Sequence, residues 1–418
     1  MKPVCIALLA GIAACVFALP GLAAPTGTYK ERVLYSFFGS YGEFPEASLI
    51  DVKGILYGTT AAGGNASDFG TAFSLDPRTG AVSVLHTFCS EQNCTDGARP
   101  EAGLVDINGK LYGTTESGGA TDWGTVFSLD PATGAETVIH SFCSRGNCAD
   151  GSFPLADLIA VGRELYGTTY YGGGAGCSDY GCGTVFEIDL HTGREKVLYR
   201  FGGAPDGAAP HAGLIDVNGI LYGTTEAGGS AGYGTVFSVD SSTDVETVLY
   251  SFLSGTDGAA PVADLVDVGG LLYGTTSEGG NTGCSLDLGC GTVFSVNPDT
   301  GAETLIHVFA DTPDGANPES GLINANGILY GTTASGGGGG KLCHFGCGTV
   351  FSIDPTTATE TVLHSFCSGH RTCLRNGTFP YSGLISVHGR LYGTTQSGGG
   401  DCEQEGCGTV FELKEKRR

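Results

Sequence analysis

The pentapeptide Leu-Tyr-Gly-Thr-Thr occurs seven times in this chain and constrains its fold more than any other feature. The copies begin at Leu56, Leu111, Leu165, Leu221, Leu272, Leu329 and Leu391. Successive copies are 55, 54, 56, 51, 57 and 62 residues apart. A regular period that runs from end to end indicates one repetitive architecture. A residue present in every copy therefore serves the repeat, and departures from the repeat are the candidates for function.

Each repeat is predicted to contain four short strands. In the second copy these strands are residues 102–107, 111–115, 124–129 and 136–142. Asn108-Gly109 is a two-residue hairpin turn that needs positive φ, and Asp-Pro-Ala-Thr-Gly at 130–134 forms a second turn. Four antiparallel strands with short connections are typical of a β-propeller blade. A helical solenoid would need a 3.6-residue hydrophobic period, which is absent.

The two ends of the chain predict how a ring would close. Residues 31–37 form a fourth strand with no blade before it, and residues 408–413 form a third strand with no fourth. We therefore predict an all-β, seven-bladed β-propeller with four antiparallel strands per blade. The N-terminal strand 31–37 would complete the C-terminal blade, and closure would remove exposed sheet edges. This strand would be outermost, so the first strand of each repeat would line the central channel.

The N-terminus is typical of a secretory signal peptide. Lys2 precedes an almost wholly apolar stretch, residues 5–19, and small residues at 21 and 23 suit cleavage after Ala23. We expect a signal peptide at 1–23 and one propeller domain at 24–418, secreted or periplasmic. A lipidated Cys15 is the alternative, because residues 12–15 resemble a lipobox. No other segment is long and apolar enough to span a bilayer.

Cysteine usage points to the same compartment. Fourteen of the 16 cysteines lie outside the signal region and form seven local pairs. These pairs are Cys89/Cys94, Cys143/Cys148, Cys177/Cys182, Cys284/Cys290, Cys343/Cys347, Cys367/Cys373 and Cys402/Cys407. Close pairing next to an export signal favours disulfides in an oxidising compartment. Metal binding is disfavoured, because no pair has the Cys-x-x-Cys spacing and separate repeats hold the pairs apart.

The formal net charge of −24 excludes nucleic acid as a favoured partner, because a polyanion would be repelled. A cationic or neutral extracellular partner remains compatible with this charge. We expect a monomer without a cofactor or a metal.

The combination of Leu-Tyr-Gly-Thr-Thr, Gly-Gly, Gly-Thr-Val-Phe and Asp-Pro-x-Thr-Gly resembles the Gloeobacter–Verrucomicrobia-type tandem repeat. That repeat is found in bacterial choice-of-anchor surface proteins. The resemblance covers nearly the whole mature chain and implies an exported bacterial repeat protein at the cell surface. It implies no particular activity.

Any binding site is expected on one face of the ring. The loops from fourth to first strand and from second to third strand would share this face, which would carry all the cysteine pairs. These loops are long and variable, and binding residues tend to lie on loops held by a rigid scaffold. The candidate ligand-binding residues are Glu116, Trp123, Tyr170, Tyr171, Glu226, Tyr233 and Glu278.

Each type of candidate has a structural alternative. The aromatic residues before the third strand, Phe69, Trp123 and Tyr233, could stack on a sugar, but packing is favoured because cysteine replaces them in the other four blades. The glutamates could supply acid–base chemistry if two converged. They are expected on non-neighbouring blades or opposite parts of the ring, which disfavours catalysis.

Two sets of repeated residues are assigned structural roles. The loop aspartates could bind cations, but capping of a turn is favoured because they recur; they are Asp96, Asp150, Asp206, Asp257 and Asp314, with Asn376 and Tyr41 at the equivalent places. The histidines share one slot in the fourth strand, where packing is favoured over zinc; they are His86, His140, His307 and His364.

The sequence thus favours a binding or scaffolding module for an extracellular protein or glycan. The alternative is a carbohydrate-active enzyme, a hydrolase or lyase, that uses carboxylates on the loop face. No Gly-x-Ser-x-Gly elbow, phosphate loop or His-Glu-x-x-His motif is present.

Overall fold

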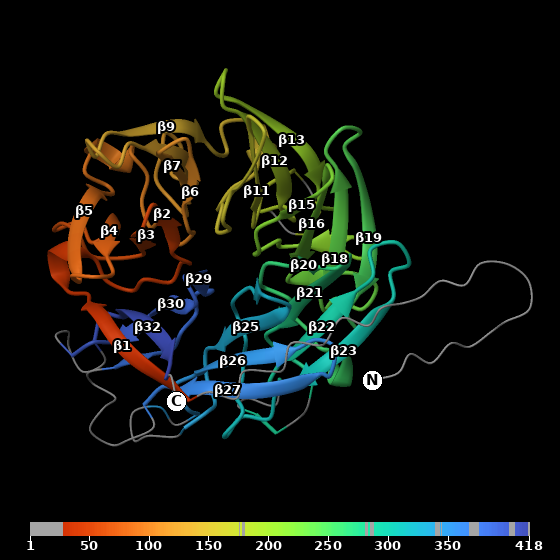
Figure 1. The fold of residues 1–418 in the computed structure, drawn as a ribbon. Helices are drawn as coiled ribbons and strands as arrows, with labels where there is room; N and C mark the ends of the chain where they lie inside the picture. Colours follow the sequence, from red (N-terminus) through yellow and green to blue (C-terminus); the bar gives the residue numbers. More distant parts are fainter. Residues whose placement is uncertain are drawn as a thin grey trace, which may run out of the picture.

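The computed structural model describes residues 28–174, 176–177, 180–280, 283–284, 288–338, 343, 345–367, 376–400 and 406–416. These residues form seven four-stranded antiparallel sheets arranged as blades around a common axis (Figure 1). The predicted seven-bladed propeller is confirmed. The signal peptide at 1–23, Cys15, Cys373 and Cys402 lie outside the described residues. None of the described residues belongs to a helix long and apolar enough to cross a membrane.

The blades are numbered in chain order. Blade 1 contains β2 (Ile50–Val52), β3 (Ile55–Thr60), β4 (Thr71–Asp76) and β5 (Ala81–Thr87). Blade 2 contains β6 (Val105–Ile107), β7 (Lys110–Thr115), β8 (Thr125–Leu129) and β9 (Glu136–Ser141). Blade 3 contains β10 (Ile159–Val161), β11 (Glu164–Thr169), β12 (Thr184–Asp189) and β13 (Arg194–Arg200). Blade 4 contains β15 (Ile215–Val217), β16 (Ile220–Thr225), β18 (Thr235–Asp240) and β19 (Val245–Ser251).

The remaining blades follow the same plan. Blade 5 contains β20 (Val266–Val268), β21 (Leu271–Thr276), β22 (Thr292–Val296) and β23 (Glu303–Val308). Blade 6 contains β24 (Ile323–Ala325), β25 (Ile328–Thr333), β26 (Thr349–Asp354) and β27 (Thr359–Ser365). Blade 7 contains β29 (Ile385–Val387), β30 (Arg390–Thr395), β32 (Thr409–Glu415) and β1 (Tyr29–Ser36). Two short ladders join the loops of one face: β14 (Gly207–Ala208) with β17 (Ala227–Gly228), and β28 (Gly377–Thr378) with β31 (Ser397–Gly398).

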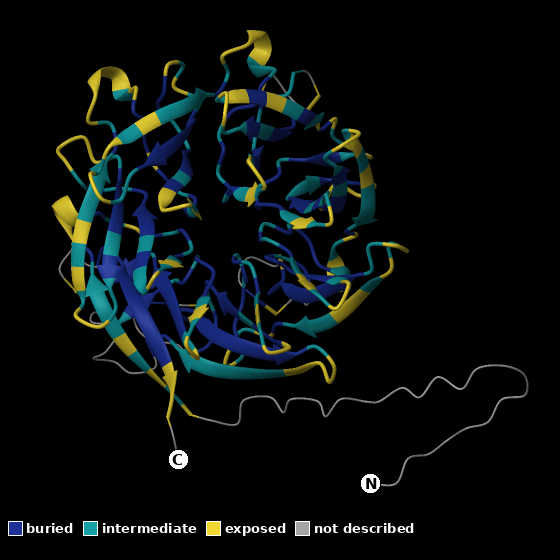
Figure 2. Cartoon of the chain, turned by 45° about the horizontal axis from the view of Figure 1, so that its top comes forward, coloured by how far each residue is buried: buried dark blue, intermediate teal, exposed yellow. Residues whose placement is uncertain are grey.

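Blade 7 is assembled from both ends of the chain. Its strand order is β1-β32-β30-β29, and β1 runs antiparallel to β32 with Ser36 opposite Thr409. The N-terminal strand is therefore outermost, as predicted. The short first strands of successive blades contact one another around the axis, so they line the centre of the ring. The third strands are the most buried, and the outer strands expose alternate residues (Figure 2).

The Leu-Tyr-Gly-Thr-Thr pentapeptide is explained by packing within and between blades. In blade 2, Leu111 is buried, and a Cβ on Gly113 would lie 2.8 Å from the ring of Phe127. The hydroxyl of Thr114 donates to the carbonyl of Ala156 in blade 3 (3.3 Å). The second threonine pairs with a threonine of the third strand in the same blade, and both types of bond occur in all seven blades. The repeat therefore encodes strand pairing and blade-to-blade cohesion.

Pairs of phenylalanine rings hold neighbouring blades together. Phe142 follows the outer strand of blade 2, and its ring meets that of Phe186 in blade 3 edge-on, with centroids 5.0 Å apart. The same contact recurs at each junction of the ring. Such edge-to-face pairs favour association beyond the burial of their area. The core is thus a series of small clusters between blades.

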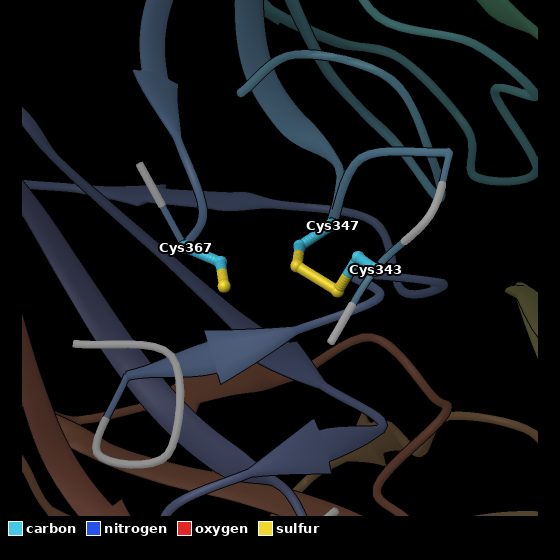
Figure 3. Close-up of side chains that lie close together, drawn as sticks. All are labelled: Cys343, Cys347 and Cys367. Carbon is cyan, nitrogen blue, oxygen red and sulfur yellow. A yellow bond between two sulfur atoms is a disulfide. The ribbon is translucent and has the colours of Figure 1, made fainter. Parts of the chain in front are cut away.

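Disulfides are confirmed in the described part of the chain. Five predicted pairs are bonded: Cys89–Cys94, Cys143–Cys148, Cys177–Cys182, Cys284–Cys290 and Cys343–Cys347. Cys367 and Cys407 are also disulfide-bonded. The sulfurs of Cys343, Cys347 and Cys367 lie close together (Figure 3). Because each of these three is oxidised, this cluster does not offer the thiolates that a metal ion would need.

Candidate functional site

All seven blades contribute to one cavity at the mouth of the central channel. The cavity has a volume of about 110 Å³ and is lined by the residues that precede each first strand. At the equivalent position of the repeat these are Glu46, Glu101, Leu155, His211, Val262, Glu319 and Tyr381. On this side of the ring, the loop from fourth to first strand forms backbone bridges with the loop from second to third strand, as between Ser152 and Tyr171. The mouth therefore opens on the face that carries the disulfides.

Carboxylates from the loops before the first strands and from the loops after the second strands lie around this mouth. Burial raises the pKa of Glu319 to about 7, and the charges of Glu226, Glu46 and Glu278 contribute to the rise. Burial likewise raises the pKa of Glu278, with a contribution from Glu226. These mutual effects mean that carboxylates of several blades lie near enough to repel one another. A positive charge placed among them would relieve that repulsion.

One arginine offsets part of this charge. Nε of Arg99 lies 2.7 Å from Glu116 and its Nη2 lies 3.0 Å from Glu101. The side-chain amide of Gln396 donates to Glu46 at 2.6 Å. Burial still raises the pKa of Glu46 and of Glu116. The mouth therefore keeps an excess of carboxyl groups.

Two further carboxylates lie inside the channel. Asp157 and Asp264 occupy a repeat position that is glycine or Ser48 in the other blades. Oδ1 of Asp157 accepts a hydrogen bond from the amide of Gly103 (2.5 Å), and Oδ1 of Asp264 accepts one from Gly213 (2.6 Å). The surrounding blades desolvate both groups and raise their pKa values, and the charge of Asp157 adds to the rise at Asp264. Each aspartate thus ties its blade to the preceding blade and makes the channel more acidic.

An arc of aromatic rings crosses the loops of blades 2 and 3 beside the mouth. The ring of Trp123 lies 5.1 Å from that of Phe153, which lies 5.9 Å from Tyr171. Tyr171 meets Tyr170 at 4.6 Å and Tyr180 at 5.8 Å. The predicted candidates Trp123, Tyr170 and Tyr171 are therefore connected through Phe153.

The arc reaches the acidic mouth at Tyr170. Its hydroxyl donates a hydrogen bond of 2.8 Å to Oε2 of Glu226, and its ring lies 6.0 Å from that of His211. Burial and the charge of Glu226 raise the pKa of Tyr170 far above its usual range, so it remains a hydrogen-bond donor. The mouth carboxylates, the aromatic arc and His211 together form a surface, here called the mouth–arc surface. Its residues are Glu46, Glu101, Glu116, Trp123, Phe153, Tyr170, Tyr171, His211, Glu226, Glu278 and Glu319.

The structure corrects one expectation about the predicted residues. Glu226 and Glu278 lie on the neighbouring blades 4 and 5 and influence each other electrostatically, so the expectation of non-neighbouring blades was wrong for this pair. Tyr233 is 44% exposed on a blade 4 loop, where its carbonyl accepts from Ala260. Tyr233 is therefore not one of the residues that define the mouth–arc surface, whereas the other six candidates all belong to it.

Sequence reasoning missed the residues that come before the first strands. Glu46, Glu101, His211 and Glu319 were interpreted as part of the repeat, although the residue type at this repeat position differs from blade to blade. Asp157 and Asp264 were also missed. The available signal was the replacement of a repeated glycine by aspartate at these two positions.

The loop aspartates and the histidines have structural partners. Oδ2 of Asp150 accepts from the backbone amide (3.0 Å) and hydroxyl (2.6 Å) of Ser144. Although burial opposes it, the imidazole of His140, whose Nε2 lies 3.4 Å from Oδ2, and hydrogen bonds from Ser144 lower the pKa of Asp150. His140 in turn meets the ring of Phe142 edge-on at 4.9 Å. These contacts favour the turn-capping and packing interpretations over a cation site.

Comparisons with known proteins identify the repeat and the fold. The model of the Gloeobacter/Verrucomicrobia repeat matches residues 18–179 and 175–411. No curated protein matches the sequence. The extracellular domain of a protein from B. thetaiotaomicron, named as a one-component system, is 10% identical with a TM-score of 0.55. That match covers 94% of this chain, which spans only 40% of the other protein's length.

A second solved structure covers more of its own length. A Bacteroides uniformis ATCC 8492 protein, named as a 6-phosphogluconolactonase, is 17% identical with a TM-score of 0.51. The match covers 81% of this chain and 88% of that one. At such identities both likenesses show the propeller fold alone.

Proposed function

We propose that this chain, which belongs to the Gloeobacter/Verrucomicrobia repeat family, is an exported binding module that holds an extracellular glycan or protein on its mouth–arc surface. The disulfides support an oxidising location, secreted or periplasmic. A rigid closed ring that displays variable loops suits recognition.

The observation that carries this proposal is the contact between the aromatic arc and the acidic mouth at Tyr170. Aromatic faces pack against flat apolar surfaces and against cations, while the carboxylates of Glu226 and Glu319 favour a positive charge. Both features suit a ligand that presents a ring or an apolar side chain next to an amine. Amino-sugar glycans and lysine-bearing proteins have this chemistry.

A matched pair of glycans tests the role of charge. Glucosamine oligomers and N-acetylglucosamine oligomers share a ring but differ in the amine charge, and isothermal titration calorimetry can compare them. We expect the charged oligomer to bind more tightly and to weaken as salt is added. Lysine-bearing peptides provide the protein arm of the same experiment.

Variants locate the binding site. Tyr170→Ala and Glu226→Gln should weaken binding of whichever probe binds, whereas Phe345→Ala, at a 56% exposed residue of blade 6, should not. If neither amine-bearing glycans nor lysine-bearing peptides bind, the charge argument is wrong. Binding that is unaffected by Tyr170→Ala and Glu226→Gln would place the site elsewhere.

A carbohydrate-active enzyme is the second candidate function. The raised pKa of Glu319, about 7, would suit a general acid beside ionised carboxylates. Incubation with a panel of neutral and charged polysaccharides should then release oligosaccharides, and Glu319→Gln should abolish their release. If the wild-type protein releases none, this candidate fails while the binding proposal stands.

A further inference from the structure

Pairs of carboxyl groups lie at the junctions between neighbouring blades, far from the channel mouth. Here a seam denotes the outer strand of one blade with its following loop, together with the outer strand of the next blade. At four seams, a loop aspartate faces a glutamate at the start of the next outer strand. These pairs are Asp96 with Glu136, Asp206 with Glu246, Asp257 with Glu303, and Asp314 with Glu360.

A tyrosine or histidine of the preceding outer strand also reaches each aspartate. Tyr199 donates to Asp206 at 3.0 Å, and Tyr250 donates to Asp257 at 2.6 Å. Nε2 of His86 lies 3.4 Å from Asp96, and Nε2 of His307 lies 3.1 Å from Asp314. The aspartates also accept from loop amides, so they are held by several donors.

The carboxylate oxygens of the glutamates have fewer hydrogen-bond donors than those of the aspartates. Oε1 is buried without a hydrogen-bond partner, within the described part of the chain, in Glu136, Glu246, Glu303 and Glu360. A buried, charged oxygen that lacks a donor carries a desolvation cost, and the neighbouring aspartate adds repulsion. One proton on the pair removes the second negative charge.

Electrostatics agree with this geometry. Burial raises the pKa of Glu136, Glu246, Glu303 and Glu360 to about 7, and the facing aspartate contributes at each seam. Glu91 also faces Glu136, Tyr199 faces Glu246, and His307 faces Glu360. The same arrangement has therefore been built four times around one ring.

We propose that each of these four seams holds one proton on its pair of carboxyl groups, and that release of these protons above neutral pH loosens the contacts between blades. These pairs would then stabilise the ring more in mildly acidic surroundings than in neutral or alkaline ones.

Three other seams serve as internal comparisons. Between blades 2 and 3, Arg145 forms an ion pair with Glu195 (2.5 Å), so a fixed positive charge takes the place of the proton. Between blades 6 and 7, the neutral amide of Asn376 donates to Glu31 at 2.8 Å, and burial without a facing aspartate raises the pKa of Glu31 to about 7. Between blades 7 and 1, the equivalent of the glutamate is Val82. Each comparison seam differs from the four in lacking a second carboxyl group or in containing an arginine.

The sign of the pH effect follows from linkage. A pKa raised in the folded state stabilises the protein at low pH, and this stability is lost as pH rises through about 7. Burial lowers the pKa of His86 and of His364, the latter to about 4, which opposes the effect below the ordinary histidine pKa of about 6.5. The window from pH 6.5 to 8.0 therefore lies above the histidines and contains the seam glutamates, together with Glu31, Glu319 and Asp264, whose pKa values burial also raises to about 7.

The test compares the wild-type protein with the quadruple variant Glu136→Gln, Glu246→Gln, Glu303→Gln and Glu360→Gln. Glutamine resembles a protonated glutamate and cannot lose a proton. Between pH 6.5 and 8.0, we expect the unfolding equilibrium constant of the wild type to rise by up to about fourfold per seam, or up to about 200-fold for four seams. The constant for the variant should rise less by that factor, because only groups outside the four seams, such as Glu31, Glu319 and Asp264, still titrate near pH 7.

Controls separate this proposal from general charge effects. Glu415→Gln, at an exposed residue of β32, should keep the wild-type pH dependence. Should the quadruple variant fail to fold, Glu360→Gln alone should reduce the rise in the unfolding constant by up to about fourfold. In infrared difference spectra between pH 8.0 and 6.5, the wild type should gain a stronger protonated-carboxyl band than the variant. Equal slopes for wild type and variant, or carboxyl bands of equal intensity, would overturn the proposal.

Discussion

Removing one ring of a phenylalanine pair between blades should destabilise the whole propeller. Phe142 and Phe186 are both fully buried, and their rings meet edge-on at 5.0 Å between blades 2 and 3. Phe142→Ala removes the ring and leaves a cavity, which costs about 3–5 kcal/mol in well-packed cores. Phe345→Ala removes a ring that is 56% exposed, so we expect a change within about 0.5 kcal/mol.

A double-mutant cycle isolates the contact between the two rings. Phe142→Leu and Phe186→Leu should show a coupling energy of about 0.5–1.5 kcal/mol, because each change removes the same edge-to-face contact. Phe142→Leu and Phe294→Leu act at separate seams and should be additive within about 0.5 kcal/mol. The second pair is the matched control for the first.

Guanidinium denaturation gives the required free energies of unfolding. Far-ultraviolet circular dichroism follows the strands, and the fluorescence of Trp123 follows the loop face, so coincident transitions would justify a two-state treatment. The reasoning fails if Phe142→Ala costs no more than Phe345→Ala. It also fails if Phe142 couples to Phe294 as strongly as to Phe186, because the coupling would then not depend on ring contact.

Two further predictions concern the scaffold. Thiol titration of the denatured, unreduced mature protein should find essentially no free cysteine, and several reactive thiols would contradict the disulfide framework. Gly113→Ala should destabilise the protein by about 1–3 kcal/mol, since the new Cβ would lie 2.8 Å from the ring of Phe127. Gly146→Ala, where a Cβ would meet nothing within 4 Å, is the control and should change stability little; similar losses for both glycines would refute the steric explanation.

The ring could be predicted from the sequence because its determinants are local and repeated. Leu111, Gly113 and the two threonines after it act within their own blade or on the next blade, and the same contacts recur in every copy. The orphan strand at the N-terminus then required a partner, which β32 provides. Period, strand pattern and closure all follow from neighbours in the repeat.

The mouth–arc surface could be predicted only in part, because its residues come from different blades and are distant in the sequence. Tyr170 and Glu226 are 56 residues apart, and no local pattern indicates that one hydroxyl reaches the other's carboxylate. Phe153 lies in the loop between blades 2 and 3 and resembles other loop residues, yet it joins Trp123 to Tyr171. The candidates after the pentapeptides were visible because their identity varies, but their distances depend on how the blades are arranged around the axis.

Variation among the repeats separates positions that the fold requires from positions that it leaves free. Four seams repeat an aspartate and a glutamate at equivalent positions, so these residues contribute to the contacts that hold the blades together. The position that lines the mouth is different: it holds a glutamate in blades 1, 2 and 6, and Leu155, His211, Val262 and Tyr381 in the others. The next residue is always alanine or serine, whose carbonyl accepts the inter-blade threonine bond in every blade. The fold thus fixes the backbone at the mouth and leaves the side chain one residue earlier free to vary. That freedom allows ligand chemistry to change there without disturbing the ring.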